Sequence, residues 1–395
     1  MKTEPVYYKD TYQKTCKATV LAIKDEGIIL DKTVFYPECG GQPGDQGTFG
    51  TWKVTDTTKD KDGTVFHHIP GFDGKIGDSY DLVLDWDHRY AYMKVHAAQH
   101  LLSGLLYHAF SIGTLSVHQG RRLLTIEIDK NEFGEDQCWH LEDLARKAIL
   151  DGHPIHYLEM PRHEAEELGM RRSIKVDSDT VRIVVIDQVD EIACGGLHVA
   201  NTREIEQIAY VGQEMIRGHV RLQFLVADEV TSSVHRWQQT IMQLCTLHSA
   251  KEDELVEKSR LLVSRLGDLE HKCTELEEQL AVSYLVQKGK GRNVIALDIS
   301  SAPVSLKAFA SGLKEEGDGA VCLVEKTDSL LRWLVFLSGR YAVLDFAEFK
   351  KNIMPLIHGK GGGRPPLWQG KGDLLPCETF LDAFVHWVTP LEQKP

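Results

Sequence analysis

The stretch MKVHAAQHLLSGLL, residues 93–106, places two histidines four residues apart in an apolar pattern of helical period. Residues four apart in a helix lie on the same face, so His96 and His100 could present two imidazoles to one metal ion. The spacing alone is weak evidence, because most such pairs are ordinary core or surface histidines. A metal site would need further ligands from another part of the chain.

The second candidate pair is in CGGLH, residues 194–198, shortly after an apolar stretch that predicts a buried strand. Two adjacent glycines allow a tight turn, in which Cys194 and His198 could converge. Three histidines and one cysteine form a nitrogen and sulfur ligand set that suits Zn²⁺. We therefore predict zinc as the cofactor, bound by His96, His100, Cys194 and His198.

Two other pairs of potential ligands fit less well. Cys138 and His140 lie in an amphipathic stretch, where packing of a helix is the simpler explanation for them. His67 and His68 are adjacent in a predicted strand, so their side chains should point to opposite faces of the sheet. Neither pair is predicted to bind the metal.

Composition limits the class of protein. The 395 residues are 42% hydrophobic and 26% charged, which fits a globular protein of several domains. The first residues are polar, and no apolar run reaches the ~20 residues of a membrane span. We therefore expect a cytoplasmic protein without membrane contact. The eight cysteines are scattered and lack the density of a disulfide scaffold.

The distribution of charge bears on nucleic-acid binding. A net charge of −13 argues against electrostatic binding of nucleic acid over the whole surface. Residues 286–395 differ from the rest, with 14 Lys and Arg against 12 Asp and Glu. A phosphate-binding surface is therefore expected in the C-terminal part of the chain.

The pattern of apolar residues divides the chain into four regions. Residues 1–86 contain short alternating stretches and Gly-rich turns, which predict a small N-terminal β-barrel. Residues 87–228 combine helical and strand-like stretches in a predicted α+β zinc-binding core. Residues 229–285 show a heptad pattern, and residues 286–395 predict an α/β domain with a second Gly-rich loop. The predicted fold class is multidomain α+β.

The heptad region predicts one long coiled-coil helix. Residues 234–280 form 47 positions of helix, or about 70 Å. The seam is regular from Leu255 onward and imperfect before it. The helix could be a spacer, one arm of a helical hairpin or the interface of a homodimer, which could also form through the C-terminal domain.

The motifs, taken in order, resemble one family. HAAQH and CGGLH are similar to the HxxxH and CxxxH pairs of the alanyl-tRNA synthetase editing domain and of free-standing alanyl-tRNA editing proteins, the AlaX family. FYPECGGQPGDQGTF, residues 35–49, resembles the Gly-rich signature of the barrel before that editing core. GKGGGRPPLWQGKG, residues 359–372, is similar to a motif of the synthetase C-terminal domain, also found in DHH-type phosphoesterases. The resemblance covers nearly the whole chain and implies the long, stand-alone editing form.

This resemblance implies an activity. Such a protein is a trans-editing hydrolase, an aminoacyl-tRNA deacylase that cleaves the ester of tRNA(Ala) mischarged with Ser or Gly in a zinc-dependent reaction. The sequence departs from the family at three positions. Ala97 and Leu197 stand where the family usually has threonine, and Cys39 replaces a third glycine of the first Gly-rich loop.

Three further residues are candidates for the chemistry. Gln99, one turn from His96, could hydrogen-bond a serine hydroxyl or the terminal ribose; the alternative is an exposed helix residue. His118, placed in a loop just before a strand, could handle a proton or contact tRNA; the alternative is a solvated histidine. Asp190 could orient a ligand imidazole.

The two Gly-rich segments are candidates for tRNA binding. Glycines let backbone N–H groups approach phosphates, and Lys and Arg supply positive charge. The alternative for each segment is a plain tight loop. The predicted tRNA-binding residues are Gly40, Gly41, Gln42, Lys360, Gly361, Gly362, Gly363, Arg364 and Lys371.

Two other functions compete with the hydrolase. One is a non-catalytic, zinc-containing module that binds tRNA or associates with a synthetase. The other is a phosphoesterase built on the C-terminal Gly-rich segment. The acidic D-H-H cluster of such enzymes is missing from the sequence, which disfavours the phosphoesterase.

Overall fold

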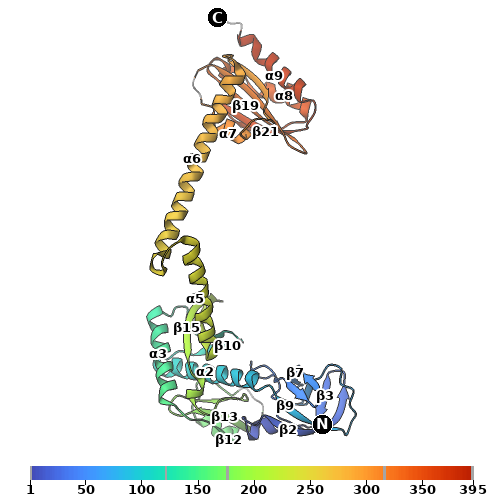
Figure 1. The fold of residues 1–395 in the computed structure, drawn as a ribbon, viewed down its shortest axis with the longest axis vertical. Helices are drawn as coiled ribbons and strands as arrows, with labels where there is room; N and C mark the ends of the chain where they lie inside the picture. Colours follow the sequence, from blue (N-terminus) through green and yellow to red (C-terminus); the bar gives the residue numbers. More distant parts are fainter. Residues whose placement is uncertain (1, 121, 175–177, 315–316, 393–395) are drawn as a thin grey trace. The chain divides into compact units, whose positions relative to one another are not determined.

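A computed structural model of the protein describes residues 2–120, 122–174, 178–314 and 317–392. It divides into two compact units, Met1–Met242 and Gln243–Pro395, and each is described by itself. Both units combine helices with sheets (Figure 1). The predicted α+β class is confirmed at this level.

The N-terminal strands form one bent sheet of seven strands, in the order β6-β5-β9-β2-β3-β8-β7. The long strand β2 pairs with β9 through its first half and with β3 through its second half, and the register shifts between Val20 and Ala22. Such a shift bends a strand. The strands are β2 (Thr15–Lys24), β3 (Gly27–Leu30), β5 (Gly47–Phe49), β6 (Trp52–Val54), β7 (Asp56–Lys59), β8 (Val65–His68) and β9 (Ser79–Leu84).

The predicted barrel is not closed. The edge strands β6 and β7 have three and four residues, and no pairing joins them within the described residues. Bending at β2 therefore curls the sheet over its core of buried side chains, such as Phe35, Phe49 and Leu82, without completing a cylinder. Before this sheet, β1 (Glu4–Pro5) pairs with β4 (Lys32–Thr33), and α1 (Val6–Lys9) follows β1.

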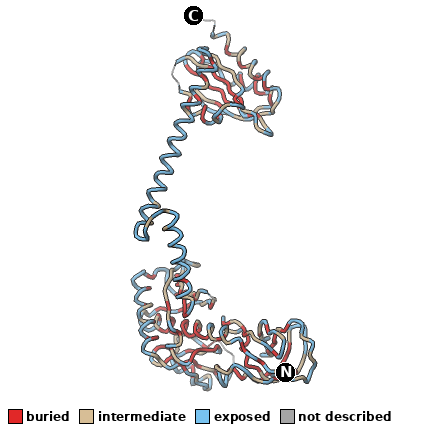
Figure 2. Tube along the Cα trace, viewed as in Figure 1, coloured by how far each residue is buried: buried red, intermediate tan, exposed pale blue. Residues whose placement is uncertain are grey.

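Helix α2 (Trp86–Phe110) is the element on which the first unit is built. Its N-cap is Asp85, whose carboxylate accepts the backbone N–H of His88, and it ends at Ser111 in a left-handed conformation with φ 56°. The middle of the helix, including Met93, Ala97 and Leu101, is completely buried (Figure 2). The predicted helix around the first histidine pair is confirmed.

The rest of the described part of this unit contains two antiparallel sheets, helices α3 and α4, and the first part of α5 (Asp228–His248). One sheet has the order β10-β11-β16-β15, and the other has the order β12-β13-β14. The elements are β10 (Thr114–Gln119), β11 (Leu124–Ile128), α3 (Glu135–Asp151), β12 (Ile155–Pro161), α4 (Arg162–Glu167), β13 (Thr180–Ile186), β14 (Asp190–Ala193), β15 (Ile208–Ile216) and β16 (His219–Val226).

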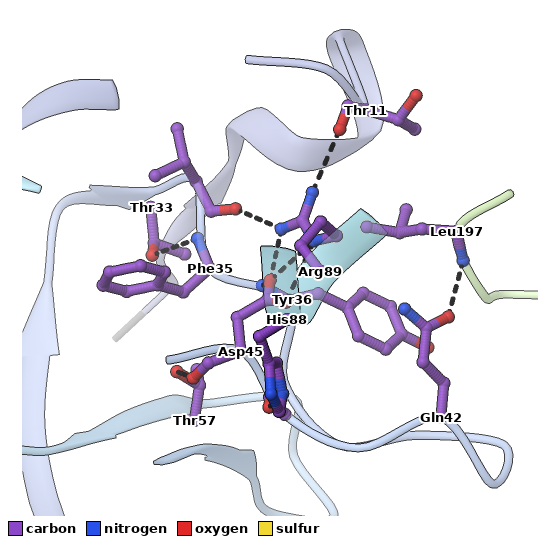
Figure 3. A network of polar contacts seen from close by, with 12 residues as sticks. Thr11, Thr33, Phe35, Tyr36, Gln42, Asp45, Thr57, His88, Arg89 and Leu197 are labelled. Carbon is purple, nitrogen blue, oxygen red and sulfur yellow. Dashed lines mark hydrogen bonds and ion pairs between the residues drawn. The ribbon is translucent and has the colours of Figure 1, made fainter. Parts of the chain in front are cut away.

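A buried ion pair fastens the first Gly-rich loop to α2 (Figure 3). Arg89 Nε lies 2.9 Å from each carboxylate oxygen of Asp45, and Nη2 also contacts that carboxylate. Nη1 and Nη2 of Arg89 also donate to the carbonyls of Thr11 and Val34, at 3.1 and 2.6 Å. The side chains of Arg89 and Asp45 are 0% and 2% exposed. The charge of Arg89 is therefore fully compensated inside the protein.

The predicted single long helix was wrong, because two helices occupy the heptad region. α5 (Asp228–His248) ends before Ser249, which has a left-handed φ of 47°. The carboxylate of Glu254 then accepts the N–H of Lys251 and starts α6 (Leu255–Gly289) through a short turn. The regular part of the heptad is thus the part that lies in α6.

The heptad seam of α6 is exposed over most of its length (Figure 2). Leu262, Leu266, Leu269 and Leu276 are 42–58% exposed, and no described residue covers them. A role of α6 as a spacer and a role as the interface of a homodimer therefore both stay predictions.

The C-terminal sheet has the order β17-β18-β19-β21-β20. One face packs against the end of α6 and against α7, and the other face packs against α8 and α9. The Gly-rich segment predicted as a loop forms the antiparallel hairpin β20–β21 at one edge. The elements are β17 (Val294–Asp298), α7 (Leu306–Gly312), β18 (Gly319–Lys326), β19 (Leu331–Ser338), α8 (Phe346–Asn352), β20 (Lys360–Arg364), β21 (Leu367–Gly372) and α9 (Cys377–Glu392).

The length and apolar character of the helices bear on membrane insertion. Among the described residues, none of the helices has the length and apolar character needed to cross a bilayer.

The buried pair predicts a large effect on stability. Arg89→Met should lower the free energy of unfolding by about 3–5 kcal/mol, because it leaves the Asp45 carboxylate buried without its partner. Urea denaturation followed by circular dichroism measures the change. Arg146→Met is the matched control, since Arg146 and Asp143 form an exposed pair, and it should leave stability nearly unchanged. Equal stability of the two variants would contradict the role given to Arg89.

Candidate metal centre

Four side chains meet at the candidate metal centre. Their ligand atoms all lie within 4.8 Å of one another. The Cys194 sulfur is 3.5 Å from His96 Nε2 and 3.9 Å from His198 Nε2. The structure thus brings together all four residues predicted as ligands: His96, His100, Cys194 and His198. The cluster could hold one metal ion.

Local structure explains this convergence. His96 and His100 lie one turn apart in α2, and Cys194 directly follows β14. At Gly196 an added Cβ would lie 2.0 Å from Cε1 of His96. Only glycine therefore lets the turn pass against the helix, and the turn returns His198 to the same point.

Gln42 links the first Gly-rich loop to the cluster. Its Oε1 accepts the backbone N–H of Leu197 at 2.9 Å (Figure 3) and lies 3.0 Å from Nδ1 of His96. The Leu197 bond identifies this atom as the amide oxygen, so His96 donates from Nδ1 and leaves Nε2 free for a metal. The side chain is 1% exposed. The sequence predicts Gln42 only as a tRNA contact, and that contact stays a prediction. No sequence pattern indicates that Gln42 orients His96.

Asp190 and Arg171 lie next to a second histidine of the cluster, His100. Asp190 Oδ2 is 3.4 Å from Nδ1 of His100, a distance typical of an ion pair. Arg171 donates two hydrogen bonds to the same carboxylate. Asp190 therefore lies where a carboxylate that orients a ligand imidazole was predicted. Arg171 carried no signal in the sequence.

Burial and neighbouring charges shift the pKa values of Cys194, His100 and His198. Burial alone would raise the pKa of the Cys194 thiol, but His96 and His100 lower it well below its usual value of 9.0. Burial alone would lower the pKa of His100, but the thiolate and Asp190 raise it to about 9. Burial lowers the pKa of His198 well below 6.5. At neutral pH the metal-binding forms, thiolate and neutral imidazole, are thus favoured at Cys194 and His198, whereas His100 would release its proton when a metal binds.

The cluster reaches the surface at Cys194 and Gly195. Gly195 is exposed and Cys194 is partly exposed, whereas the three histidines are buried. Arg182, which the sequence analysis missed, shapes this opening by donating to the carbonyls of Cys194 and Gly196 at 3.1 and 2.7 Å. Its guanidinium stacks on the ring of Tyr157, 3.6 Å from the ring centre. An arginine that binds turn carbonyls in this way has no sequence signature.

Gln99 and His118 were predicted for the chemistry but are not among the four clustered ligands. Gln99 is 5% exposed and its amide donates to Ser103 at 3.0 Å. The alternative of an exposed helix residue was therefore wrong. His118 lies within strand β10, not in a loop, and is exposed.

The predicted tRNA contacts occupy two exposed places. Gly40 and Gly41 have φ of 62° and 87°, and an added Cβ would meet nothing within 4 Å at either position. Both glycines are exposed in the first Gly-rich loop. The residues of β20 and Lys371 are exposed as well.

The lowered pKa of Cys194 predicts its reactivity. In the metal-free protein, the rate of Cys194 alkylation by iodoacetamide should fall much less than tenfold per unit as the pH is lowered from 9, because a thiol with a lowered pKa stays ionised further below that pH. Cys16 is the control, since burial raises its pKa and its rate should fall about tenfold per pH unit. Mass spectrometry of the two peptides measures both rates. A tenfold fall per unit at Cys194 would contradict the thiolate.

Comparison with known proteins supports the order of motifs. A family model described as class II (A) tRNA synthetases matches residues 3–89. The chain is 27% identical to the alanyl-tRNA editing protein AlaX-L of Pyrococcus horikoshii, over 95% of this chain and 96% of that protein. It is 27% identical to an alanine–tRNA ligase of Methanococcus maripaludis and 26% identical to that of Archaeoglobus fulgidus.

These matches differ in how much of each relative is covered. The chain spans 42% and 44% of the two ligases, but nearly all of AlaX-L. The match to AlaX-L therefore includes both histidine-containing motifs and both Gly-rich segments within one full-length alignment. The chain is therefore similar over nearly its whole length to an alanyl-tRNA editing protein.

Proposed function

We propose that the protein is a zinc-dependent trans-editing hydrolase, which cleaves the ester of tRNA(Ala) mischarged with Ser or Gly. The observation that carries the proposal is the convergence of four metal ligands at a point where Cys194 and Gly195 reach the surface. The full-length similarity to AlaX-L supports alanyl-tRNA as the substrate class. The carboxylic ester is the bond to be broken.

Zinc fits the ligand set better than a harder ion does. Imidazole and thiolate ligands suit Zn²⁺, and bond lengths near 2.0 and 2.3 Å place tetrahedral nitrogen and sulfur ligands about 3.5 Å apart. The sulfur lies 3.5 and 3.9 Å from two imidazole nitrogens here. A bound zinc ion would supply a Lewis acid for the ester carbonyl or for water.

The residues around the ligands have distinct proposed roles. Gln42 orients the imidazole of His96, and Asp190 orients the imidazole of His100. Gln99, one turn along the buried face of α2, is proposed to hydrogen-bond the serine hydroxyl or the ribose. A site that hydrogen-bonds a hydroxyl rejects the substrate that lacks it, which spares the alanyl ester. His118 remains a proposed proton carrier or tRNA contact.

One observation favours a different function. Ala97 and Leu197 are both 0% exposed and lie in the same hydrophobic core. Threonine hydroxyls at these positions would have offered polar groups next to the ligands. Their replacement by apolar side chains favours a zinc-containing module that binds tRNA without cleaving the ester.

Deacylation distinguishes the two functions. The purified protein should hydrolyse Ser-tRNA(Ala) much faster than Ala-tRNA(Ala). His96→Ala and Cys194→Ala should each lose at least about 100-fold in rate, since removing a ligand removes the ion. Release of labelled serine measures the reaction, and Cys16→Ala is the control for loss of a non-ligand cysteine. A wild-type protein that binds zinc and leaves the seryl ester intact would favour the non-catalytic module.

We further propose that the hairpin β20–β21 binds the tRNA backbone. Residues opposite each other in a ladder share a face, as do alternate residues of a strand. Lys360 pairs with Lys371, Gly362 with Gln369 and Arg364 with Leu367, so one face carries Lys360, Gly362, Arg364, Leu367, Gln369 and Lys371. The positive side chains of Lys360, Arg364 and Lys371 thus lie on the same face as Gly362, which has no side chain.

Packing explains the outer glycines of GGG but not the middle one. At Gly361 and Gly363 an added Cβ would lie 2.4 and 2.2 Å from carbonyl oxygens of β21. At Gly362 it would meet nothing within 4 Å. A glycine that packing does not require is what a close approach of phosphate to the backbone would need. At Gly40 and Gly41 an added Cβ would also meet nothing within 4 Å, although their positive φ already favours glycine, and both are proposed to contact the acceptor end.

Charge removal tests the hairpin. The triple variant K360Q/R364Q/K371Q should weaken tRNA binding at least tenfold, and the slope of log affinity against log salt should fall by about two. The control K314Q/K350Q/K351Q removes three exposed lysines elsewhere in the same unit. Filter binding at several salt concentrations measures both variants. Equal affinity of the two would contradict a tRNA-binding role for the hairpin.

A further inference from the structure

We propose that Arg171 is a positioning residue of the metal centre, which acts by fixing Asp190 against the ligand His100. The inference rests on the proposed zinc site but not on the proposed hydrolysis. It assigns a role to a residue that lies 71 positions after His100 in the sequence and is not itself a metal ligand.

The contact between Arg171 and Asp190 is a buried, two-point contact. Nε of Arg171 donates to Oδ1 at 2.8 Å, and Nη2 donates to Oδ2 at 3.1 Å. The two side chains are 5% and 2% exposed. Two parallel hydrogen bonds fix the plane of a carboxylate, which a single bond or a lysine cannot do.

The same carboxylate oxygen faces the metal ligand. Oδ2 of Asp190, held by Nη2 of Arg171, lies 3.4 Å from Nδ1 of His100. With Nδ1 directed at Asp190, the opposite nitrogen of the ring is the one available to the cluster. Arg171 therefore determines which oxygen is opposite the imidazole and in which plane it lies.

The backbone alone does not fix this geometry. Gly104 brings α2 close to β14, because an added Cβ would lie 2.7 Å from the Val189 carbonyl oxygen and 2.8 Å from Cβ of Asp190. This close approach sets the position of the Asp190 backbone. It leaves the carboxylate free to rotate, and Arg171 removes that freedom.

The three ligand histidines differ in how they are held. His96 is held by Gln42, which is in turn held by the N–H of Leu197. Among the residues that the structure describes, neither Nδ1 of His198 nor Nδ1 of His100 makes a hydrogen bond, but Nδ1 of His100 lies 3.4 Å from the Asp190 carboxylate, within ion-pair distance. The pair of Asp190 and Arg171 is thus the counterpart, on His100, of the amide on His96.

Zinc affinity tests the proposal directly. Losing a partner that orients a ligand costs 10–100-fold in metal affinity. Competition with a chromogenic chelator should show that Arg171→Met and Asp190→Asn each raise the zinc Kd 10- to 100-fold. The double variant should lose little more than either single variant, because both changes break one chain of contacts. Arg172→Met is the matched control, since Arg172 donates to the Leu115 carbonyl instead, and its zinc Kd should stay within twofold.

Two further measurements separate positioning from a general effect on folding. Circular dichroism of the metal-free variants shows whether they fold, and Arg171→Lys decides the test if Arg171→Met does not fold. The visible spectrum of the Co²⁺-substituted protein reports ligand geometry, and it should change in Arg171→Lys but not in Arg172→Met.

The outcomes are distinct from those of the hydrolysis test. An unchanged zinc Kd and Co²⁺ spectrum in a folded Arg171 variant would overturn the proposal, as would a wild-type protein that binds no zinc. A protein that binds zinc through this network and leaves seryl-tRNA intact would remove the hydrolase and keep the role of Arg171.

Discussion

The buried contact between Asp45 and Arg89 is the interaction on which the candidate site depends. Arg89 lies two turns before His96 in α2, and Asp45 lies in the Gly-rich loop that also carries Gln42. The ion pair therefore fixes the loop to the ligand-bearing helix, and the loop supplies the amide that orients His96. The N-terminal sheet is in this way part of the metal centre and not a separate attachment.

The metal centre is supported from two directions. The N-terminal loop reaches His96 through Gln42, while the segment before β13 reaches His100 through Arg171 and Asp190. Both supports are buried and polar, and each would be costly if it lost one member. Among the described residues around the cluster, Gly195 in the turn held by Arg182 is exposed. We expect a substrate to approach the ligands at this turn.

The four ligands could be predicted from the sequence because their signals are local. Helical spacing joins His96 to His100, and two glycines close the turn between Cys194 and His198. Gln42 and Arg171 could not be assigned in this way, because their contacts depend on how distant segments pack. The end of the helix at Ser249 could not be predicted from the heptad, because a residue with a left-handed backbone conformation does not change the spacing of the apolar residues around it. The closed barrel failed for a similar reason, since alternation predicts strands but not whether their edges meet.

The central claim is that three imidazoles and one thiolate surround a single zinc ion. X-ray absorption at the zinc K-edge, on the full-length protein purified with its metal, tests it most directly. The account predicts one sulfur at about 2.3 Å and three nitrogen neighbours at about 2.0 Å, with the outer-shell pattern of imidazole rings. A zinc spectrum without sulfur, or with oxygen neighbours only, would contradict it.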